Sequence, residues 1–191
     1  MTSASKSSWW SFASNDVRSA RRMRTLVNTH HDFIWRSLRR LGVAPADVDD
    51  GTQQVFLIAA RKLEFIRSGC ERRFLYQTAL RIASDYRRTV HRRDEVAGDA
   101  EDSLVDSAPL APELLEMRQA REQLDIILDE MPIDLRAIFV LYEIDEMSAP
   151  DIAALLEIPL GTVASRLRRA RAEFSAAANR GIARAADGGS R

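Results

Sequence analysis

The sequence predicts an all-α protein built from two small helical domains, which an acidic flexible linker joins. Apolar residues recur at intervals of three and four along most of the chain, the spacing that places them on one face of a helix. A helix-turn-helix pattern occupies residues 148–174, and an acidic stretch with two prolines separates two blocks of periodic sequence. The 191 residues divide into an N-terminal tail (1–20), a first domain (21–93), the linker (94–117), a second domain (118–176) and a C-terminal tail (177–191).

The first 20 residues contain seven serines and no helical periodicity, so we expect a mobile tail. They nevertheless include Trp9, Trp10 and Phe12, and large aromatic side chains cost free energy when they are exposed to water. Two interpretations stay open. Either these side chains dock on the first domain or on a partner, or the segment is an incidental disordered extension.

Three helices are expected in the first domain. The first begins near Arg21 and ends at Gly42, a residue that favours the left-handed conformation of a helix C-cap. The second begins near Pro45 or Ala46 with carboxylates in its first turns, where they favour the positive end of the helix dipole. It includes Gly51, which costs about 1 kcal/mol relative to alanine in a helix interior and suggests close packing there. A connection at residues 64–70 leads into the third helix.

The third helix combines a basic face with aromatic residues. Its arginines are Arg72, Arg73, Arg81, Arg87, Arg88, Arg92 and Arg93, and its aromatic residues are Phe74, Tyr76 and Tyr86. This combination suits single-stranded nucleic acid, because a base can stack on a ring while an arginine holds the phosphate. On this helix alone the alternative is equally open: the aromatic residues belong to the core and the arginines are merely solvated.

In the second domain, two helices that break at Pro132 precede the helix-turn-helix pattern. Ser148 and Asp151 match a capping box, and Pro159 stops the short first helix of the motif near Glu157. Apolar residues of the second helix recur at spacings of four, three and four and leave a polar, cationic face. The candidate DNA-binding residues of this face are Thr162, Ser165, Arg166, Arg168, Arg169 and Arg171. Such a helix fits the major groove of duplex DNA, and the alternative is a solvated surface helix that ends an ordinary bundle.

Charge is balanced overall but unevenly distributed. The chain has 28 basic and 28 acidic residues, which at first argues against a nucleic-acid partner. Residues 1–93 carry 18 basic against 8 acidic side chains, and residues 94–117 carry 8 acidic and no basic ones. Residues 118–157 carry 3 basic against 10 acidic side chains, and residues 158–191 carry 7 against 2. Two basic blocks therefore flank an acidic middle, and most of their cations are arginine, which suits phosphate and guanine, although a GC-rich genome would produce the same bias.

Other classes of protein lack support in the sequence. Cys70 is the single cysteine, so no intrachain disulfide can form, and the apolar runs are far shorter than a membrane span. The N-terminus lacks the apolar core of a signal peptide, so we expect a soluble, cytoplasmic protein. His30 and His31 have no cysteine or carboxylate at metal-ligand spacing, and there is no glycine-rich phosphate loop or nucleophile elbow. We therefore expect no metal, no cofactor and no small-molecule substrate.

Segments of both domains resemble the extracytoplasmic-function (ECF) group of bacterial RNA polymerase sigma factors. In the first domain, residues 47–57 (DVDDGTQQVFL) are similar to the group's core-binding helix, "DAEDVVQEVFL", and residues 74–79 (FLYQTA) are similar to "WLYRIA". In the second domain, residues 131–141, 152–153 and 161–171 are similar to "LPxxxREVFLL", "EIA" and "GTVKSRLHRAR". No single segment is diagnostic, but their order and spacing over residues 24–175 are specific to this group.

The chain also departs from the group's pattern. Gln54 stands where the group usually has glutamate, and Gly51 stands where it has an aliphatic residue. Phe74 stands where the group has tryptophan, and Ala164 stands where it has lysine. Residues 69–72 lack the group's usual pattern of small and aromatic residues. The group's promoter preference is therefore least transferable at this loop and at Ala164.

The resemblance implies a promoter-specificity subunit with no catalytic activity, whose partners are RNA polymerase core, promoter DNA as duplex and as melted single strand, and an anti-sigma factor. It places core binding at Asp47, Asp50, Gln53, Gln54, Phe56 and Leu57. It places recognition and melting of the minus-ten element at residues 64–73 and at Arg72, Arg73, Phe74, Tyr76, Arg81, Asp85, Arg87 and Arg88. The helix at residues 161–174 would bind the minus-thirty-five element as duplex.

Two other functions stay as alternatives. The main one is a free-standing helix-turn-helix transcriptional regulator, in which residues 21–93 serve as a dimerisation or sensor domain. Binding to core polymerase discriminates between this regulator and a sigma factor. An enzyme is the third candidate, and screening for hydrolase or transferase activity is expected to find none.

Overall fold

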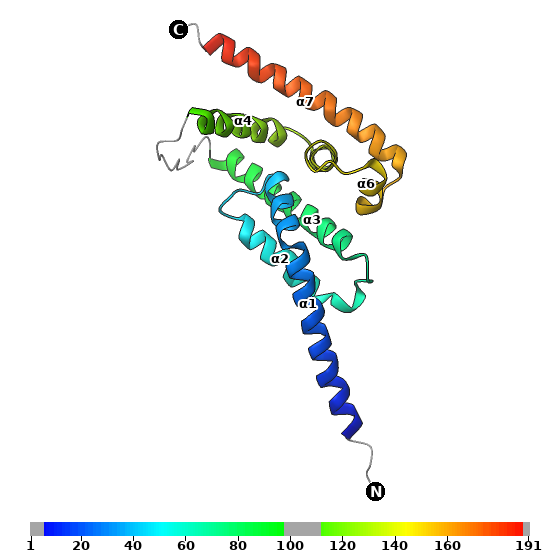
Figure 1. Cartoon of the computed structure of the whole chain (residues 1–191). Coiled ribbons are helices and arrows are strands. Elements are labelled where there is room, and N and C mark those ends of the chain that lie inside the picture. The colour runs from blue at the N-terminus through cyan, green and yellow to red at the C-terminus, as the bar shows by residue number, and fades with distance from the viewer. Residues whose placement is uncertain (1–5, 98–111, 189–191) are drawn as a thin grey trace.

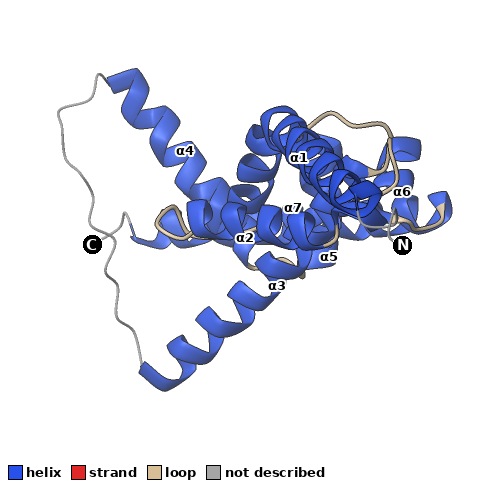
Figure 2. Cartoon of the chain, turned by 90° about the horizontal axis from the view of Figure 1, so that it is seen from below, coloured by secondary structure: helices blue, strands red, loops and turns tan. Residues whose placement is uncertain are grey.

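The structure, a computed structural model, describes residues 6–97 and 112–188 of the 191-residue chain. Figure 1 and Figure 2 show helices and the loops that connect them, and the described residues contain no strand. The all-α fold class predicted from the sequence is confirmed. Within the described ranges, no helix is both long enough and apolar enough to cross a membrane.

The first domain packs three helices around one core. They are α1 (Lys6–Arg40), α2 (Val48–Arg61) and α3 (Glu71–Ala97), and a short 3-10 turn, η1 (Leu63–Phe65), lies between α2 and α3. Each helix contacts the other two. Ile34, Val55 and Leu75, one from each helix, are fully buried in the shared core, so the apolar stripes predicted for these helices are confirmed.

Two glycines of this domain have different roles. Gly42 follows α1 with φ of +98°, which confirms the predicted left-handed C-cap. Gly51 lies inside α2, and a Cβ added there would lie 3.4 Å from Cδ1 of Leu38 and 3.8 Å from Cγ2 of Ile82. Both distances are ordinary van der Waals contacts, so the expectation that close packing requires glycine at this position is wrong.

The N-terminal segment differs from the sequence-based expectation. α1 begins at Lys6, so residues 6–20, expected as a tail without helix, continue the first helix beyond the packed domain (Figure 1). Extension of an existing helix costs far less than nucleation of a new one, and serine is only mildly unfavourable in a helix. The side chains of Trp9, Trp10 and Phe12 lie outside the described part, so the two interpretations of these aromatic residues stay predictions.

The second domain contains four helices. They are α4 (Pro112–Asp129), α5 (Ile133–Phe139), α6 (Ala149–Leu156) and α7 (Leu160–Gly188). A π-helical turn, η2 (Val140–Ile144), follows α5 directly. Leu141, Ile152 and Val163 are buried where α5, α6 and α7 meet, and the rings of Phe139 and Phe174 stack with centroids 4.7 Å apart. α7 therefore packs, between Val163 and Phe174, against the helices that precede it.

The segment between the domains is more helical than expected. α3 continues to Ala97 and α4 begins at Pro112, where a missing N–H costs nothing because the first turn of a helix has no acceptor for it. Helix therefore occupies both ends of the range expected as linker, and these two helix ends project from the packed helices (Figure 2). Residues 98–111 lie outside the described residues.

The two domains lie against each other, with α3 of the first domain packed on α6 of the second (Figure 1). Tyr76 of α3 is buried in the core of the second domain, beside residues such as Ile138 and Leu155. Ala137 of α5 is buried in the core of the first domain. Each domain therefore contributes a side chain to the core of the other.

Candidate nucleic-acid interface

The helix-turn-helix geometry begins at the N-terminus of α6. The Ser148 hydroxyl accepts a hydrogen bond from the backbone N–H of Asp151 (3.3 Å) and donates one to its carboxylate (2.6 Å), which confirms the predicted cap. Glu157 ends the helix in the left-handed conformation, with φ of +55°. Pro159 follows and α7 begins at Leu160, so the turn lies where the sequence predicts it.

α7 buries one face and exposes the other. Val163, Leu167 and Ala170 are buried, as their spacing predicts. The candidate side chains lie on the other faces: Thr162 and Arg166 are half-buried, and Ser165, Arg168, Arg169 and Arg171 are exposed. The predicted recognition residues of α7 therefore all lie outside its buried stripe, at exposed or half-buried positions.

Two of the candidate DNA-binding arginines of α7 already have partners within the second domain. Nε of Arg171 donates to the Glu143 carboxylate at 2.6 Å, a bond that raises the pKa of Arg171, and its guanidinium lies 5.3 Å from the centroid of the Tyr142 ring. Nε of Arg166 lies 3.7 Å from a carboxylate oxygen of Asp134 in α5. The Arg166 pair is the longer of the two, so it is the easier one to exchange for a nucleic-acid contact.

Arg168 and Arg169 differ from these two residues. Both are exposed, and the described residues offer them no ion pair or side-chain hydrogen bond. An uncommitted, solvated guanidinium loses no existing contact when it binds a phosphate. These two side chains are therefore the most available phosphate ligands on α7.

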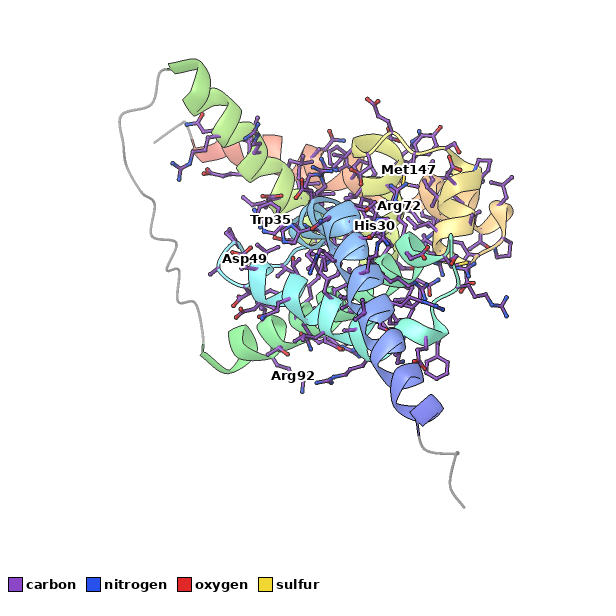
Figure 3. The ribbon with its side chains drawn as sticks, turned by 60° about the horizontal axis from the view of Figure 1, so that its bottom comes forward. His30, Trp35, Asp49, Arg72, Arg92 and Met147 are labelled. Carbon is purple, nitrogen blue, oxygen red and sulfur yellow. The ribbon has the colours of Figure 1, made fainter. Side chains whose placement is uncertain are left out.

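The first half of α3 faces the second domain. The Arg72 guanidinium lies 4.2 Å above the centroid of the Phe33 ring, and its Nη2 lies 3.6 Å from the Met147 sulfur (Figure 3). Nη1 of Arg73 lies 2.9 Å from a carboxylate oxygen of Glu157, at the end of α6. These two arginines of the predicted melting surface are therefore engaged by other parts of the same chain.

The aromatic residues of α3 are less accessible than a stacking surface requires. Phe74 is half-buried against the core of the first domain, and Tyr76 is 1% exposed. Burial raises the pKa of the Tyr76 phenol, and none of the described residues pairs with its hydroxyl. The expectation of an exposed aromatic face is therefore wrong for Tyr76 in this arrangement, because the helix buries a second face against the second domain.

The second half of α3 is more open. Arg81 is exposed, and Arg88 pairs with Asp85 one turn earlier on the same helix. Arg87 instead turns toward the second domain, where its Nη2 donates to the backbone carbonyl of Asp129 at 2.7 Å. Burial lowers the pKa of Arg87, and the positive charge of the Arg136 guanidinium in the second domain lowers it further. Arg81 and Arg88 therefore remain at the surface, whereas Arg87 belongs to the contact between the domains.

Phe65 is an exposed aromatic residue that sequence reasoning did not single out. It lies on η1 within the loop that leads to α3, and 83% of its surface is accessible. Loop segments have no helical period, so nothing in the sequence separates an exposed phenylalanine from a buried one here. An open aromatic ring beside a basic helix is the kind of surface on which an unpaired base stacks.

A groove between α1 and α2 contains most of the predicted polymerase-binding residues. It has a volume of about 510 Å³, and Asp50, Gln53, Phe56 and Leu57 of α2 line it together with residues of α1. Leu57 is 51% exposed, an unusual position for a leucine unless a partner covers it. The structure therefore gathers four of the six candidates around one partly apolar depression.

The other two candidates lie elsewhere. The Asp47 carboxylate accepts a hydrogen bond from the Tyr86 hydroxyl at 2.8 Å, so it ties α2 to α3, and Gln54 is exposed outside the groove. Asp49, which sequence reasoning passed over, lines the groove and accepts a hydrogen bond from Nε1 of Trp35 at 2.8 Å (Figure 3). A pattern of acidic residues at a helix start does not show which of them faces a neighbouring helix.

Comparison with known proteins decides the family. The Sigma-70 region 4 family model matches residues 121–174, which include the whole helix-turn-helix. The ECF RNA polymerase sigma-E factor of Haemophilus influenzae is 33% identical over 156 residues, which cover 76% of this chain and 82% of that protein. The chain belongs to the ECF RNA polymerase sigma factors.

Other ECF sigma factors give the same result. The sigma-E factor of Escherichia coli K12 is 33% identical over 138 residues, which cover 68% of this chain and 72% of that protein. SigE of Mycolicibacterium smegmatis is 29% identical over 150 residues, which cover 78% of this chain but only 58% of that longer protein.

Solved structures support the fold of this sigma factor. CnrH, solved in complex with the cytosolic domain of CnrY, superposes with a TM-score of 0.59 at 23% identity over 85% of this chain and 96% of that chain. The sigma factor RpoE of Bartonella quintana, solved with the anti-sigma factor NepR, gives 0.59 at 17% identity over 82% of this chain and 96% of that chain. At these identities the likeness concerns the fold alone.

Proposed function

We propose that this ECF sigma factor directs promoter-specific initiation through three surfaces: the groove between α1 and α2 binds RNA polymerase core, α7 binds duplex DNA upstream, and the η1–α3 region captures the melted strand. The observation that carries this proposal is the accessible basic face of α7, held behind a capped α6 within the matched region 4 segment.

The upstream element is bound as duplex by the outer face of α7. Arg168 and Arg169 contact phosphates, because they are exposed and uncommitted. Arg166 exchanges its 3.7 Å contact with Asp134 for a base edge, an exchange that costs about 0–1 kcal/mol for a partly exposed ion pair. Ser165 lies beside them, and its hydroxyl can donate or accept a further hydrogen bond with the DNA.

The melted strand of the downstream element is bound by the first domain. Stacking of one base on the exposed Phe65 ring is worth about 1–3 kcal/mol, which offsets part of the cost of unstacking that base. Arg81 and Arg88 are placed at the surface to hold the backbone of the same strand. This role of η1 fits the loop at residues 64–73, which the family resemblance assigned to melting.

Core polymerase binds at the groove between α1 and α2. Leu57 offers exposed apolar area, and Asp49, Asp50 and Gln53 provide a polar, acidic rim. A complementary partner surface therefore presents apolar side chains with basic residues around them. We also propose an anti-sigma factor as a further partner of this chain. We assign no catalytic activity and no cofactor to the chain itself.

Binding to purified core polymerase tests the proposal and excludes the free-standing regulator. Leu57→Ser with Gln53→Ala is expected to weaken core binding at least tenfold, because both side chains line the groove and neither is needed for the core of the domain. Gln54→Ala is the matched control, since Gln54 is exposed on the same helix outside the groove. Absence of micromolar core binding by the wild-type chain, or equal losses in both variants, would contradict the assignment.

A further inference from the structure

The exposed face of α7, which lies along the outer edge of the second domain (Figure 1), changes character along the helix. Its exposed positions recur as neighbouring pairs, one turn apart: residues 160–161, 164–165 and 168–169. Val163 and Leu167 are buried on the opposite side, so these six positions form one stripe that points away from the core. The first four residues of the stripe are uncharged, and the last two are Arg168 and Arg169. An uncharged part of the stripe therefore precedes a cationic part.

The uncharged part presents apolar side chains to solvent. Leu160, the first residue of α7, is 51% exposed, and Ala164, one turn later, is exposed as well. A Cβ added to Gly161, which lies between them, would meet no heavy atom of the described residues within 4 Å. A single exposed leucine is common on protein surfaces, but this one begins the helix whose arginines are proposed to hold DNA. Leu160 and Ala164 therefore form a small apolar surface that a ligand of α7 can reach.

The arginines determine which end of this stripe meets the bases. Phosphates hold Arg168 and Arg169 at the DNA backbone, because both guanidinium groups are exposed and positively charged. In helix-turn-helix proteins the second helix lies in the major groove with its N-terminal residues against the base edges. Leu160 lies about 12 Å along the axis from Arg168, at a rise of about 1.5 Å per residue, and the major groove is about 12 Å wide. A helix anchored at the backbone by its arginines therefore carries Leu160 and Ala164 to the bases.

The chemistry of this apolar surface restricts the bases that it can recognise. Leucine and alanine side chains neither donate nor accept hydrogen bonds, so against a guanine, cytosine or adenine edge they leave polar groups without partners. Thymine is the base that presents a methyl group in the major groove, and apolar side chains contact that methyl group. The lysine that ECF sigma factors usually have at position 164 favours guanine instead, so alanine at this position removes a competing contact.

We propose that Leu160 and Ala164 recognise the C5-methyl groups of one or two thymines in the upstream element. This inference rests on the proposed function, since it names bases that the same face of α7 recognises. Arg168 and Arg169 supply affinity without sequence preference, because phosphates are alike at every base pair. Leu160 and Ala164 supply sequence preference, because the methyl group that they contact distinguishes thymine from the other bases.

Removal of single methyl groups from the DNA tests the inference. Holoenzyme, assembled from the full-length chain and core polymerase, first selects duplexes from a library in which the upstream element is randomised, and the selected duplexes are sequenced. Thymine is expected to be enriched at one or two positions of the element. Each thymine of the most enriched duplex is then replaced singly by deoxyuridine, which pairs in the same way but lacks the methyl group. At a contacted position this replacement is expected to weaken binding about fourfold, the effect of one methyl group that is returned to water.

Leu160→Ala connects the methyl group to one side chain. The variant keeps α7, because Leu160 is half exposed and alanine is the better helix former. It is expected to bind the thymine duplex about fourfold more weakly than the wild type does, and to match the wild type within about twofold on the deoxyuridine duplex. Ile126→Ala is the matched control, because Ile126 is a 62% exposed aliphatic residue of α4. This control is expected to keep the affinity of the wild type for both duplexes.

Ala164→Lys tests the second position by a change of preference. A lysine there can donate to O6 and N7 of guanine but has no favourable contact with a methyl group. Holoenzyme with this variant is expected to select guanine in place of thymine at one position of the element, and to keep the thymine that Leu160 contacts.

The other outcomes overturn the inference and separate it from the proposed function. Selected elements without an enriched thymine, or equal affinity for the thymine and deoxyuridine duplexes, show that α7 recognises its element without methyl contacts, while the proposed function stands. A deoxyuridine effect of full size in Leu160→Ala, and again in Ala164→Lys, assigns the methyl group to other residues. Failure to enrich any upstream element overturns the inference together with the proposed role of α7.

Discussion

Substitution of Gly42 by alanine tests how tightly the end of α1 is packed against the second domain. The backbone at Gly42 has φ of +98°, and a left-handed conformation costs a residue with a Cβ about 1–2 kcal/mol. A Cβ there would lie 3.0 Å from Nη1 of Arg136 and 3.0 Å from Oδ1 of Asp129. The Arg136 side chain is 1% exposed and donates to the Arg40 carbonyl, so it cannot withdraw without loss of that bond.

Loss of a hydrogen bond from a charged group costs about 1.5–3 kcal/mol. Together with the backbone cost, Gly42→Ala is expected to lower the free energy of unfolding by about 2.5–5 kcal/mol. Gly69→Ala is the control: its φ is +83°, but no heavy atom lies within 4 Å of the added Cβ, so only the backbone cost of about 1–2 kcal/mol applies. Urea unfolding of the full-length chain measures both values.

A double-mutant cycle separates the two causes. In an Arg136→Ala background the crowded guanidinium is gone, so Gly42→Ala is expected to cost only the backbone strain, about 1–2 kcal/mol. Equal losses for Gly42→Ala and Gly69→Ala in the wild-type background, or an unchanged cost after removal of Arg136, would refute the reasoning.

Gly51→Ala is expected to raise the free energy of unfolding by about 0.5–1 kcal/mol, because the new methyl group fits at contact distance and alanine is the better helix former; a lower urea midpoint would contradict this. Tyr76→Phe is expected to stabilise the protein by about 1 kcal/mol, because it removes a buried hydroxyl without a partner, and destabilisation of that size would show that the hydroxyl is hydrogen-bonded. In footprints on the upstream element, Arg166→Ala is expected to cost about 1–3 kcal/mol and to relax one base position. Arg169→Ala is expected to weaken binding to all sequences alike and to reduce the salt dependence of binding by about one phosphate contact. Arg171→Ala is expected to have a smaller effect, because Glu143 already holds the Arg171 side chain. Equal losses of specificity at all three arginines would count against these roles.

Features set by neighbouring residues could be predicted from the sequence. The cap of Ser148 on Asp151, the end of α6 near Glu157 before Pro159 and the buried stripe of α7 all depend on spacings within one or two turns. The C-cap at Gly42 could be predicted in the same way, because a residue without a side chain adopts a positive φ at little cost.

Features set by contacts between distant segments could not be predicted. The period of α3 marks Leu75 as core, but it does not show that Tyr76, on another face, packs into a different domain. Asp47 and Asp49 both look like acids of a helix start, yet one ties α2 to α3 and the other borders the groove. The exposure of Phe65 likewise depends on how its loop is held, which no local pattern expresses.

The π-helical turn η2 (Val140–Ile144) has a consequence for insertions and deletions in this region. A π-turn holds one residue more than an α-turn, so deletion of a single residue here would restore an α-helix and leave the chain beyond it in nearly the same orientation. Insertion of one residue would instead rotate the chain beyond this point by about 100°, the angle that one residue covers in an α-helix. Glu143, which meets Arg171 of α7, and Asp145, which meets Arg40 of the first domain, lie at or just after this turn and would lose their partners together after such an insertion. The direction of the recognition helix and the contact between the domains therefore tolerate the loss of one residue at this point far better than the gain of one.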